Sequence, residues 1–406
     1  MNQGAARSDR VQCCIVGGGP AGMMLGFLLA RAGVSVAVLE KHADFFRDFR
    51  GDTIHPSTLE VMHELDLLDE FLARPHQELQ ELGGQVGDFF ATLADFRYLP
   101  TRCKFVALMP QWDFLDFIAQ AARPYPSFRL MMNTDAVDLV VDGGRITGVR
   151  AQTPEGPLDI AADLVVGADG RHSTVRAKAP FEVLDLGAPM DVLWLRLTRR
   201  ASDGGQTLGR VQRGALFVTI DRRDYWQCAY VIPKGSFANM KERGLDAFRA
   251  EIVRIAPHFA DRMNEIARWD DVKLLTVAVD RIRRWHRPGL LLIGDAAHAM
   301  SPIGGVGINL AIQDAVAAAN ILAAPLRGGA VTERDLAAVQ RRREFPTRMT
   351  QRAQIFIQNR FLTRVLAGAP IKPPLALKLM QRHPVLRRLP ARLAGMGFRP
   401  EHVRDR

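Results

Sequence analysis

The first forty residues alternate between apolar and amphipathic segments in the order strand, helix, strand. Residues 11–16 form a short apolar run that predicts a strand, and residues 20–32 carry apolar side chains at helical spacing. Residues 34–39, which consist mainly of Val, Ala and Leu, predict a second strand. Two strands joined by a helix in this way are typical of a parallel sheet that has helices on its faces.

The pattern changes twice farther along the chain. Residues 111–123 predict an amphipathic helix, and short strands follow it, with turn signals at residues 142–144 and 154–156. Strand-like runs then dominate and predict a second, sheet-rich domain. These runs cover residues 191–197, 215–220, 225–232 and 272–279. Residues 290–294 return to the style of a buried parallel strand, and an Ala-rich helix extends from there to about residue 324.

The first domain is therefore interrupted in the sequence and completed late, so we expect an α/β fold with three parts. The first domain combines residues 1–74, 100–180 and 286–345, and the sheet-rich second domain combines residues 75–99 and 181–285. Residues 346–406 form a basic, helical C-terminal segment.

The net charge of +10 is concentrated in this C-terminal segment, which holds 13 Lys and Arg but only 2 Asp and Glu. Two interpretations are open: contact of the tail with a membrane surface or an acidic partner, or a solvated helical tail whose leucines pack on the body. We favour packing. Nucleic-acid binding is not expected, because no recognised nucleic-acid module accompanies the charge.

Nothing in the sequence indicates export, a transmembrane segment or a metal site. The N-terminus has no apolar signal-peptide core, and no apolar run approaches the length needed to cross a bilayer. Of the four cysteines, Cys13 and Cys14 lie in an apolar strand, and Cys103 and Cys228 stand alone. None forms a CxxC pair, so we expect a reducing, cytoplasmic location and no metal. The sequence gives no signal for the oligomeric state.

A GxGxxG motif directly follows the first strand and opens the first helix. Gly17 permits the tight turn, Gly19 lets the backbone approach a pyrophosphate, and Gly22 lets helix and strand pack closely. Ala21 lies within the same turn. Glu40 ends the second strand about 20 residues on, where a carboxylate accepts hydrogen bonds from a ribose diol. The motif predicts dinucleotide binding, without separating NAD from FAD.

Two later stretches make that separation: the sequence VGADGRHSTVR at residues 166–176, and LIGDAAH at residues 292–298 with its glycine-rich continuation. With the GxGxxG motif, they occur in the order and spacing of the flavin-dependent monooxygenases of the aromatic hydroxylase class. The chain resembles this family, which includes p-hydroxybenzoate hydroxylase and the ubiquinone-pathway hydroxylases, over roughly residues 10 to 350. The resemblance implies a glutathione-reductase-type, Rossmann-like FAD domain and a mixed-sheet substrate domain.

The resemblance also implies which residues hold a non-covalent FAD. Asp295 would bind the ribityl chain, and the glycine-rich loop that opens the Ala-rich helix would approach the flavin ring. Asp169 and Gly170 would lie beside the pyrophosphate, although Asp169 equally fits a role in holding its own loop. The other cofactor-binding positions carried over are Arg50, Gln111, Val137, Gly304, Gly307 and Asn309.

The activity implied is hydroxylation of an aromatic or quinone-precursor substrate with O2 and transient NADH or NADPH, through a flavin C4a-hydroperoxide. No residue must be the catalytic base. His55, Tyr225 and His298 are the candidates for direct catalysis, each with an equally simple structural role. A halogenase, a reductase or dehydrogenase and a non-catalytic flavin-binding protein remain alternatives, although the halogenase motif WxWxIP is absent from the sequence.

Overall fold

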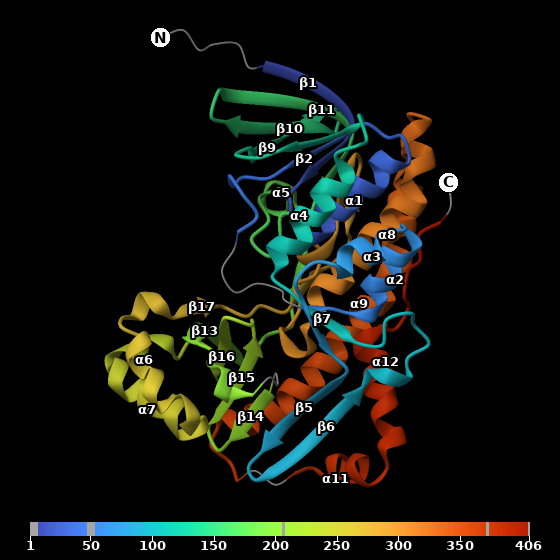
Figure 1. The fold of residues 1–406 in the computed structure, drawn as a ribbon. Coiled ribbons are helices and arrows are strands. Elements are labelled where there is room, and N and C mark those ends of the chain that lie inside the picture. Colours follow the sequence, from blue (N-terminus) through green and yellow to red (C-terminus); the bar gives the residue numbers. More distant parts are fainter. Residues whose placement is uncertain (1–6, 47–52, 205–207, 371–372, 405–406) are drawn as a thin grey trace.

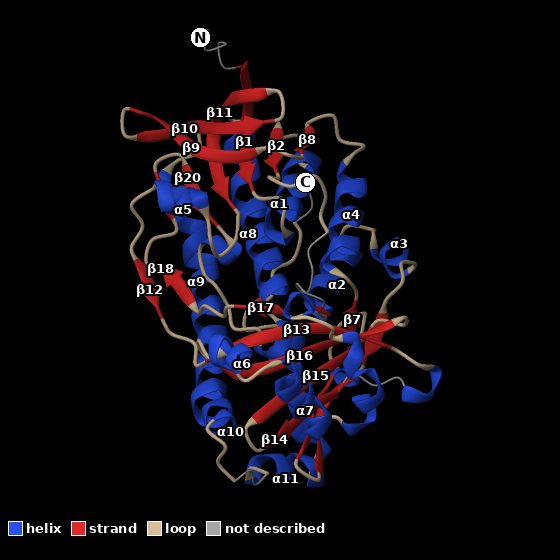
Figure 2. Cartoon of the chain, turned by 90° about the vertical axis from the view of Figure 1, so that its left-hand side faces the viewer, coloured by secondary structure: helices blue, strands red, loops and turns tan. Residues whose placement is uncertain are grey.

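The computed structural model describes residues 7–46, 53–204, 208–370 and 373–404, and Arg50 lies outside these ranges. Two sheets occupy opposite ends of the molecule, and the long helices α8 and α9 extend between them (Figures 1 and 2). The arrangement is the α/β fold with two sheets and C-terminal helices that the sequence predicts.

The first sheet is built on a parallel core in the order β20-β11-β1-β2-β8, with β19 at one edge and the antiparallel strands β10 and β9 branching from β11. Its late strand β20 pairs with β11, which confirms that the chain returns to this sheet near residue 290. The strands of the first sheet are β1 (Arg7–Val16), β2 (Val36–Leu39), β8 (Phe128–Met131), β9 (Asp135–Asp142), β10 (Arg145–Thr153), β11 (Gly156–Gly167), β19 (His286–Arg287) and β20 (Leu290–Leu292).

Helices cover this sheet and enclose the largest apolar core. Helix α1 packs against α8 and α4, and α8 packs in turn against α9. The helices are α1 (Pro20–Arg31), α2 (Pro56–Glu64), α3 (Leu68–Leu72), α4 (Gln111–Ala122), α5 (Thr174–Lys178), α8 (Gly307–Arg327) and α9 (Glu333–Ile357). The expectation of no membrane-length apolar segment needs correction: Ile303–Arg327 is long and apolar enough. Most of its window is buried inside the molecule, as befits a core helix.

The second sheet has the order β17-β13-β16-β15-β14-β5-β6, so residues 81–95 join the strands that follow residue 190. One face packs against helices α6 and α7 and the 3-10 segment after them. The strands are β5 (Glu81–Val86), β6 (Phe89–Asp95), β13 (Met190–Thr198), β14 (Leu208–Gln212), β15 (Ala215–Asp221), β16 (Tyr225–Pro233) and β17 (Lys273–Leu275). The strand expected at residues 272–279 is therefore shorter, and β14 lies in a Gly- and Arg-containing stretch whose apolar pattern is weak.

Smaller elements connect the two sheets. Strand β7 pairs with both β3 and β4, and β12 pairs with β18. The remaining elements are β3 (Thr53–Ile54), β4 (Gln77–Leu79), β7 (Val106–Leu108), β12 (Val183–Asp185), β18 (Asp280–Ile282), α6 (Phe237–Glu242), α7 (Leu245–Ile255), α10 (Thr363–Leu366), α11 (Leu375–Arg382) and α12 (Arg388–Gly395).

The C-terminal segment corrects two expectations. The boundary at residue 346 falls inside α9, because Pro346 lies within the helix rather than ending it. The segment does pack on the body, in part through large apolar residues: Leu362 and Val365 are buried, and α12 buries Ala391 and Gly395, whereas Leu375 and Leu389 are exposed. The Cβ that Gly395 lacks would lie 2.7 Å from Leu99, so the helix approaches too closely for its leucines to fit between.

Candidate cofactor and substrate site

The turn between β1 and α1 leaves open space at the helix N-terminus. Gly17 has φ +107°, and a Cβ there would lie 2.5 Å from the Ala168 carbonyl oxygen. A Cβ on Gly22 would lie 2.0 Å from the Gly17 carbonyl oxygen, so helix and strand require glycine here. Gly19 has no heavy atom within 4 Å of its Cβ position, and its helix has no side-chain cap. The first N–H groups of α1 thus face a space that suits a pyrophosphate.

Glu40 lies at the end of β2, directly beside this turn. Its Oε2 accepts a hydrogen bond from the Gly18 N–H at 3.1 Å, and its Oε1 accepts one from His42 N–H at 3.1 Å. The Thr134 N–H donates to the Glu40 carbonyl at 2.9 Å, which brings the chain leading to Val137 on β9 alongside. The carboxylate and the start of β9 therefore occupy the place where the sequence predicts the ribose and adenine.

Asp169 holds its own loop. Its Oδ1 accepts from the Ser173 hydroxyl at 2.5 Å and its Oδ2 from the Val175 N–H at 3.1 Å, so it fixes the start of α5. Burial raises the pKa of this carboxyl, against the lowering effect of these hydrogen bonds. Gly170 follows with φ +82°. Of the two roles left open by the sequence, the side chain performs the structural one, while its backbone lies against Gly17.

Asp295 follows β20 and keeps a third of its side chain exposed, at 34%. The Arg171 Nη2 lies 3.9 Å from its Oδ2. The preceding Gly294 has φ +57°, and a Cβ there would lie 3.2 Å from the Ala21 Cβ and 3.3 Å from the Ala311 Cβ. Helix α1, the turn at Asp295 and helix α8 therefore meet at one point, and an accessible carboxylate lies beside it.

The loop before α8 is held open by glycines and by a threonine that the sequence analysis did not single out. Gly304 and Gly305 have φ of +79° and +62°. The Thr53 hydroxyl donates to the Gly305 carbonyl at 2.7 Å. Gly307 begins α8, and no side chain caps this helix. Free N–H groups at this end stabilise negative charge, as the reduced flavin ring would require. Gln111 begins α4 just after β7, which pairs with β3 at Thr53, so it lies near this loop.

Asn309 directs its side chain at protein groups. Its Oδ1 accepts from the His55 N–H and from the Thr58 hydroxyl, both at 2.8 Å, and its Nδ2 donates to the Thr53 carbonyl at 3.0 Å. The amide therefore fastens the segment from β3 to α2 onto the first turn of α8. We assign the Asn309 side chain to positioning the loop before α8, so only the backbone of Asn309 is available to a cofactor.

The two histidine candidates are buried in the protein, which favours the structural role that the sequence left open for each. His55 contacts the Ala394 carbonyl through Nδ1 at 2.7 Å, and burial lowers its pKa to about 4. His298 donates from Nε2 to Asp314 at 2.6 Å and lies against Trp285 with ring centroids 4.9 Å apart. Neither side chain exposes a surface that could touch a substrate.

His298 belongs to a buried charge network that the sequence analysis missed. Asp314 on α8 accepts from the Gly294 N–H at 3.1 Å and from Arg343 Nε at 2.9 Å. Arg343 also bonds the Arg399 carbonyl at 3.1 Å and contacts Glu401 at 3.3 Å. Burial alone would raise the pKa of Asp314, but His298 and Arg343 outweigh it and lower the pKa. The available signal was Asp314 as the one acidic residue of the Ala-rich helix.

The second sheet turns one apolar face toward the loop before α8. On β13, β15 and β16, Trp194, Val218 and Ala229 share a cluster with Ile303 of that loop. Trp226, Cys228 and Tyr230 point to the opposite face and pack under the helices, as the strand alternation predicts. On the first of these faces, Gln227 accepts a hydrogen bond from Arg222 Nε at 3.1 Å. This face can form a mainly apolar roof, with Gln227 among its polar groups.

Tyr225 begins β16 on the roof face and is the catalytic candidate that keeps some exposure. The Arg196 guanidinium lies over its ring, 3.6 Å from the centroid. The turn between β15 and β16, which carries Arg222, lies near α4. Burial raises the pKa of Asp113 on that helix, and the positive charges of Arg74 and Arg222 oppose the rise. Tyr225 therefore lies at the rim of the roof, stacked on a cation.

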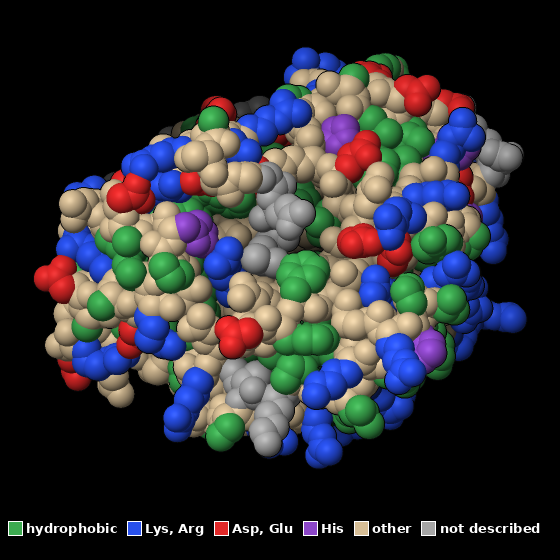
Figure 3. Space-filling model, turned by 60° about the horizontal axis from the view of Figure 1, so that its bottom comes forward, with side chains coloured by type: hydrophobic (Ala, Val, Ile, Leu, Met, Phe, Trp, Pro, Cys, Tyr) green, Lys and Arg blue, Asp and Glu red, His purple; other side chains and the backbone are tan. Residues whose placement is uncertain are grey.

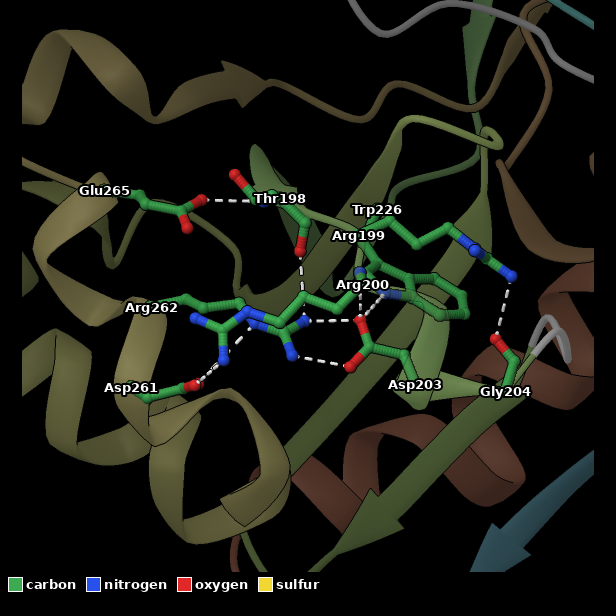
Figure 4. Close-up of polar contacts among 9 residues, drawn as sticks. All are labelled: Thr198, Arg199, Arg200, Asp203, Gly204, Trp226, Asp261, Arg262 and Glu265. Atoms are coloured by element: carbon green, nitrogen blue, oxygen red, sulfur yellow. Dashed lines mark hydrogen bonds and ion pairs between the residues drawn. The ribbon is translucent and has the colours of Figure 1, made fainter.

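A separate polar cluster lies on the helical side of the second sheet (Figure 4). Arg262 bonds both oxygens of Asp203, at 2.6 and 2.5 Å, and the Trp226 indole donates to the same carboxylate at 2.9 Å. Arg262 also donates to the Thr198 carbonyl at 3.0 Å. This arrangement holds the pKa of Asp203 well below its usual range. Each partner is engaged by protein, so we assign the cluster to fixing the 3-10 segment on the sheet.

Within the described ranges, no group of His, Cys, Asp and Glu is arranged to hold a metal ion. All four cysteines are buried and unpaired, and burial raises the pKa of Cys103 to about 11 and of Cys14 to about 12. The thiols are therefore protonated and inert at neutral pH. The chemistry of the site rests on oxygen and nitrogen groups around the two helix N-termini.

The chain is similar to flavoproteins in sequence and in structure. A family model described as "FAD binding domain" matches residues 10–353. The 6-methylpretetramide 4-monooxygenase of Streptomyces rimosus is 34% identical over 94% of this chain and 91% of its own length. PqsL, described as a probable FAD-dependent monooxygenase from Pseudomonas aeruginosa, has a TM-score of 0.73 at 22% identity, covering 89% of this chain and 99% of that one. The myxobacterial chondrochloren halogenase CndH has a TM-score of 0.74 at 19% identity, covering 93% and 90%.

Proposed function

The chain belongs to the FAD-dependent monooxygenases that act on aromatic compounds, and on that premise we propose that its own substrate is a fused-ring phenol. The observation that carries the proposal is the apolar face of β13, β15 and β16, a mainly aliphatic cluster with Trp194 that packs against Ile303 of the loop before α8. The full-length similarity to an enzyme named for 6-methylpretetramide supports the same substrate class.

The residues present fit FAD. The N-terminus of α1, with the open position at Gly19, would hold the pyrophosphate, and Glu40 would bind the ribose. Asp295 would bind the ribityl chain with its accessible carboxylate. When bound, FAD accepts a hydride from NADH or NADPH and activates O2 for transfer of one oxygen atom to the substrate. The free N–H groups at the start of α8 would stabilise the negative charge of the reduced state.

The protein's part in the reaction is to orient the phenol and exclude water. Trp194, Val218 and Ala229 supply apolar contact, which favours a flat ring system over a small polar molecule. Gln227 is buried and accepts a hydrogen bond from Arg222 Nε at 3.1 Å, so it positions the Arg222 guanidinium beside this surface. The neighbouring guanidinium favours the deprotonated, electron-rich phenolate. We infer that the enzyme works in the cytoplasm, where NAD(P)H is supplied and buried thiols stay reduced.

One experiment separates this proposal from the alternatives. The purified protein is examined for an oxidised-flavin spectrum, and NADH and NADPH consumption is then followed with fused-ring and single-ring phenols. We expect fused-ring phenols to accelerate consumption and to yield product that carries heavy oxygen from labelled O2. Consumption without labelled product would indicate a reductase, product only with halide a halogenase, and no consumption a binding protein. Faster turnover of single-ring phenols would refute the substrate class.

A further inference from the structure

The C-terminal helices present apolar side chains to the solvent among basic ones. Leu375 is 81% exposed, and Val385 and Leu389 are each 64% exposed. The same elements expose Lys378 and Arg388. We call this surface, residues 375–393, the basic apolar face; its other exposed members are Leu379, Arg382, Leu386, Arg392 and Leu393. Green and blue side chains lie interspersed toward the lower right of Figure 3, where α11 comes forward.

The exposed leucines of this face do not pack on the rest of the chain. Helix α11 buries none of its residues, and α12 buries only Ala391 and Gly395, which are already packed. The segment is fastened to the body: Gln381 Nε2 donates to the Thr92 carbonyl at 3.0 Å, and Glu401 is buried after it. The leucines are therefore held outward by a fixed scaffold.

The charge of the face indicates its partner. The sequence contains no Asp or Glu between residues 345 and 400, although 11 Lys and Arg lie there. Basic side chains interleaved with exposed leucines on short helices are typical of segments that lie in the interface of an anionic membrane, where cations meet phosphates and leucines enter the acyl region. Side chains that protrude to this extent suit a fluid layer better than a protein surface, which would need a matching set of pockets.

The face also lies next to the proposed substrate roof. Ala391, Ala394 and Met396 share a cluster with Trp194, Val218 and Ile220 of the second sheet. The Ala394 carbonyl is bonded to His55, which adjoins the loop before α8. A bilayer against α12 would thus be one helix away from the roof. An apolar aromatic substrate dissolved in that bilayer would have a short path to the site, and this part of the argument rests on the proposed function.

We propose that residues 375–393 dock the enzyme on a bilayer of anionic phospholipid, from which it takes an apolar aromatic substrate. The docking requires both components, the exposed leucines and the Lys and Arg between them. It forms no covalent bond and reverses as salt screens the charges.

The test uses the purified holoenzyme and sedimentation with two kinds of vesicle, phosphatidylcholine alone and phosphatidylcholine with phosphatidylglycerol. We expect binding to the vesicles with phosphatidylglycerol, weakened by salt. Leu375→Ser with Leu389→Ser, and separately Lys378→Glu with Arg382→Glu, should each lower the partition coefficient by about tenfold or more. Leu274→Ser removes an exposed leucine on β17 and serves as the matched control, with binding unchanged. Flavin absorbance and thermal unfolding should stay unchanged in all variants, because these side chains are exposed.

Absence of binding to vesicles with phosphatidylglycerol at low salt would overturn the proposal, as would equal binding by all variants. Size-exclusion chromatography without lipid tests whether a second copy of the chain binds this face instead. A dimer that dissociates in the Leu375→Ser, Leu389→Ser variant, together with no vesicle binding, would assign the face to a second copy. Binding of an acidic protein to the wild type, together with no vesicle binding, would assign the face to a protein partner. Vesicle binding is measured without turnover, so it stands or falls separately from the hydroxylation assay.

Discussion

Replacing Arg343 by Met tests whether the buried charge network holds the turn at Asp295. Arg343 is 1% exposed and Asp314 0% exposed, and their ion pair is 2.9 Å long. Methionine has a similar length and no charge, so the substitution leaves Asp314 ionised in the interior with His298 and the Gly294 N–H as its remaining partners. The carboxylate that stays behind, more than the lost contact itself, sets the cost.

The magnitude follows from this burial. Removing one partner of a buried ion pair costs about 3–5 kcal/mol, whereas an exposed pair contributes about 0–1 kcal/mol. The neighbouring Arg342 supplies the matched control: it lies on the same helix, is 34% exposed and bonds Glu401 at 2.6 Å. Arg342→Met should therefore lower the free energy of unfolding by about 1 kcal/mol or less. A double variant, Asp314→Asn with Arg343→Met, should recover part of the loss because no unpaired charge remains.

The assay is urea unfolding of the holoprotein, followed by tryptophan fluorescence and by flavin release on the same samples. Arg343→Met should lower the unfolding midpoint far more than Arg342→Met, and it should release flavin before the second sheet unfolds. A loss below about 1 kcal/mol for Arg343→Met, or a double variant less stable than the single one, would refute the reasoning that an unpaired Asp314 dominates.

Three further predictions follow from single sites. Gly19→Val should leave thermal stability nearly unchanged but lower the flavin content of the purified protein, because the new Cβ would enter only the proposed pyrophosphate space. Gly22→Val is the contrasting variant and should unfold the domain, because its Cβ would lie 2.0 Å from the Gly17 carbonyl oxygen. The free energy of unfolding should fall by up to about 3 kcal/mol as the pH drops from 6.5 to about 4. The reason is that burial lowers the pKa of His55 to about 4 in the folded state, whereas the unfolded state binds the proton already below about 6.5. His55→Asn should flatten that fall in urea titrations at several pH values. Trp194→Ala should raise the KM for a fused-ring phenol by about tenfold while the KM for NAD(P)H stays constant, and equal effects on both would contradict the roof assignment.

The features that the sequence predicted well are local ones. The strand, glycine turn and helix around Gly17 each depend on residues a few positions apart, and the structure places them as the motif requires. The late return of the chain was also predictable, because residues 290–294 read as a buried strand whose parallel partner had to lie in the first sheet. The family relationship rests on the same three motifs, in order.

The parts that the sequence could not predict depend on contacts between distant residues. The sequence left two roles open for His298, which lies three residues after Asp295, and its hydrogen bond to the buried Asp314 on α8 favours the structural one. Asn309 fits the flavin loop by position, but its amide is taken by the segment that begins at Thr53. The leucines of the tail behave differently from one another: Leu362 is buried, whereas Leu375 and Leu389 are exposed, and the close approach of Gly395 to the body explains why small residues pack α12.

The buried network clarifies why the cofactor site needs the whole chain. A buried ion pair is weak evidence for net stability, because desolvation offsets much of its attraction. What Asp314 gains from Arg343 is a fixed orientation, and Asp314 in turn accepts the Gly294 N–H at the turn that presents Asp295. Arg343 is itself oriented by the Arg399 carbonyl and by Glu401, near the end of the described chain. The position of Asp295, which we propose to bind the ribityl chain, therefore depends on residues more than a hundred positions later, so the proposed site is complete only when the C-terminal segment has docked.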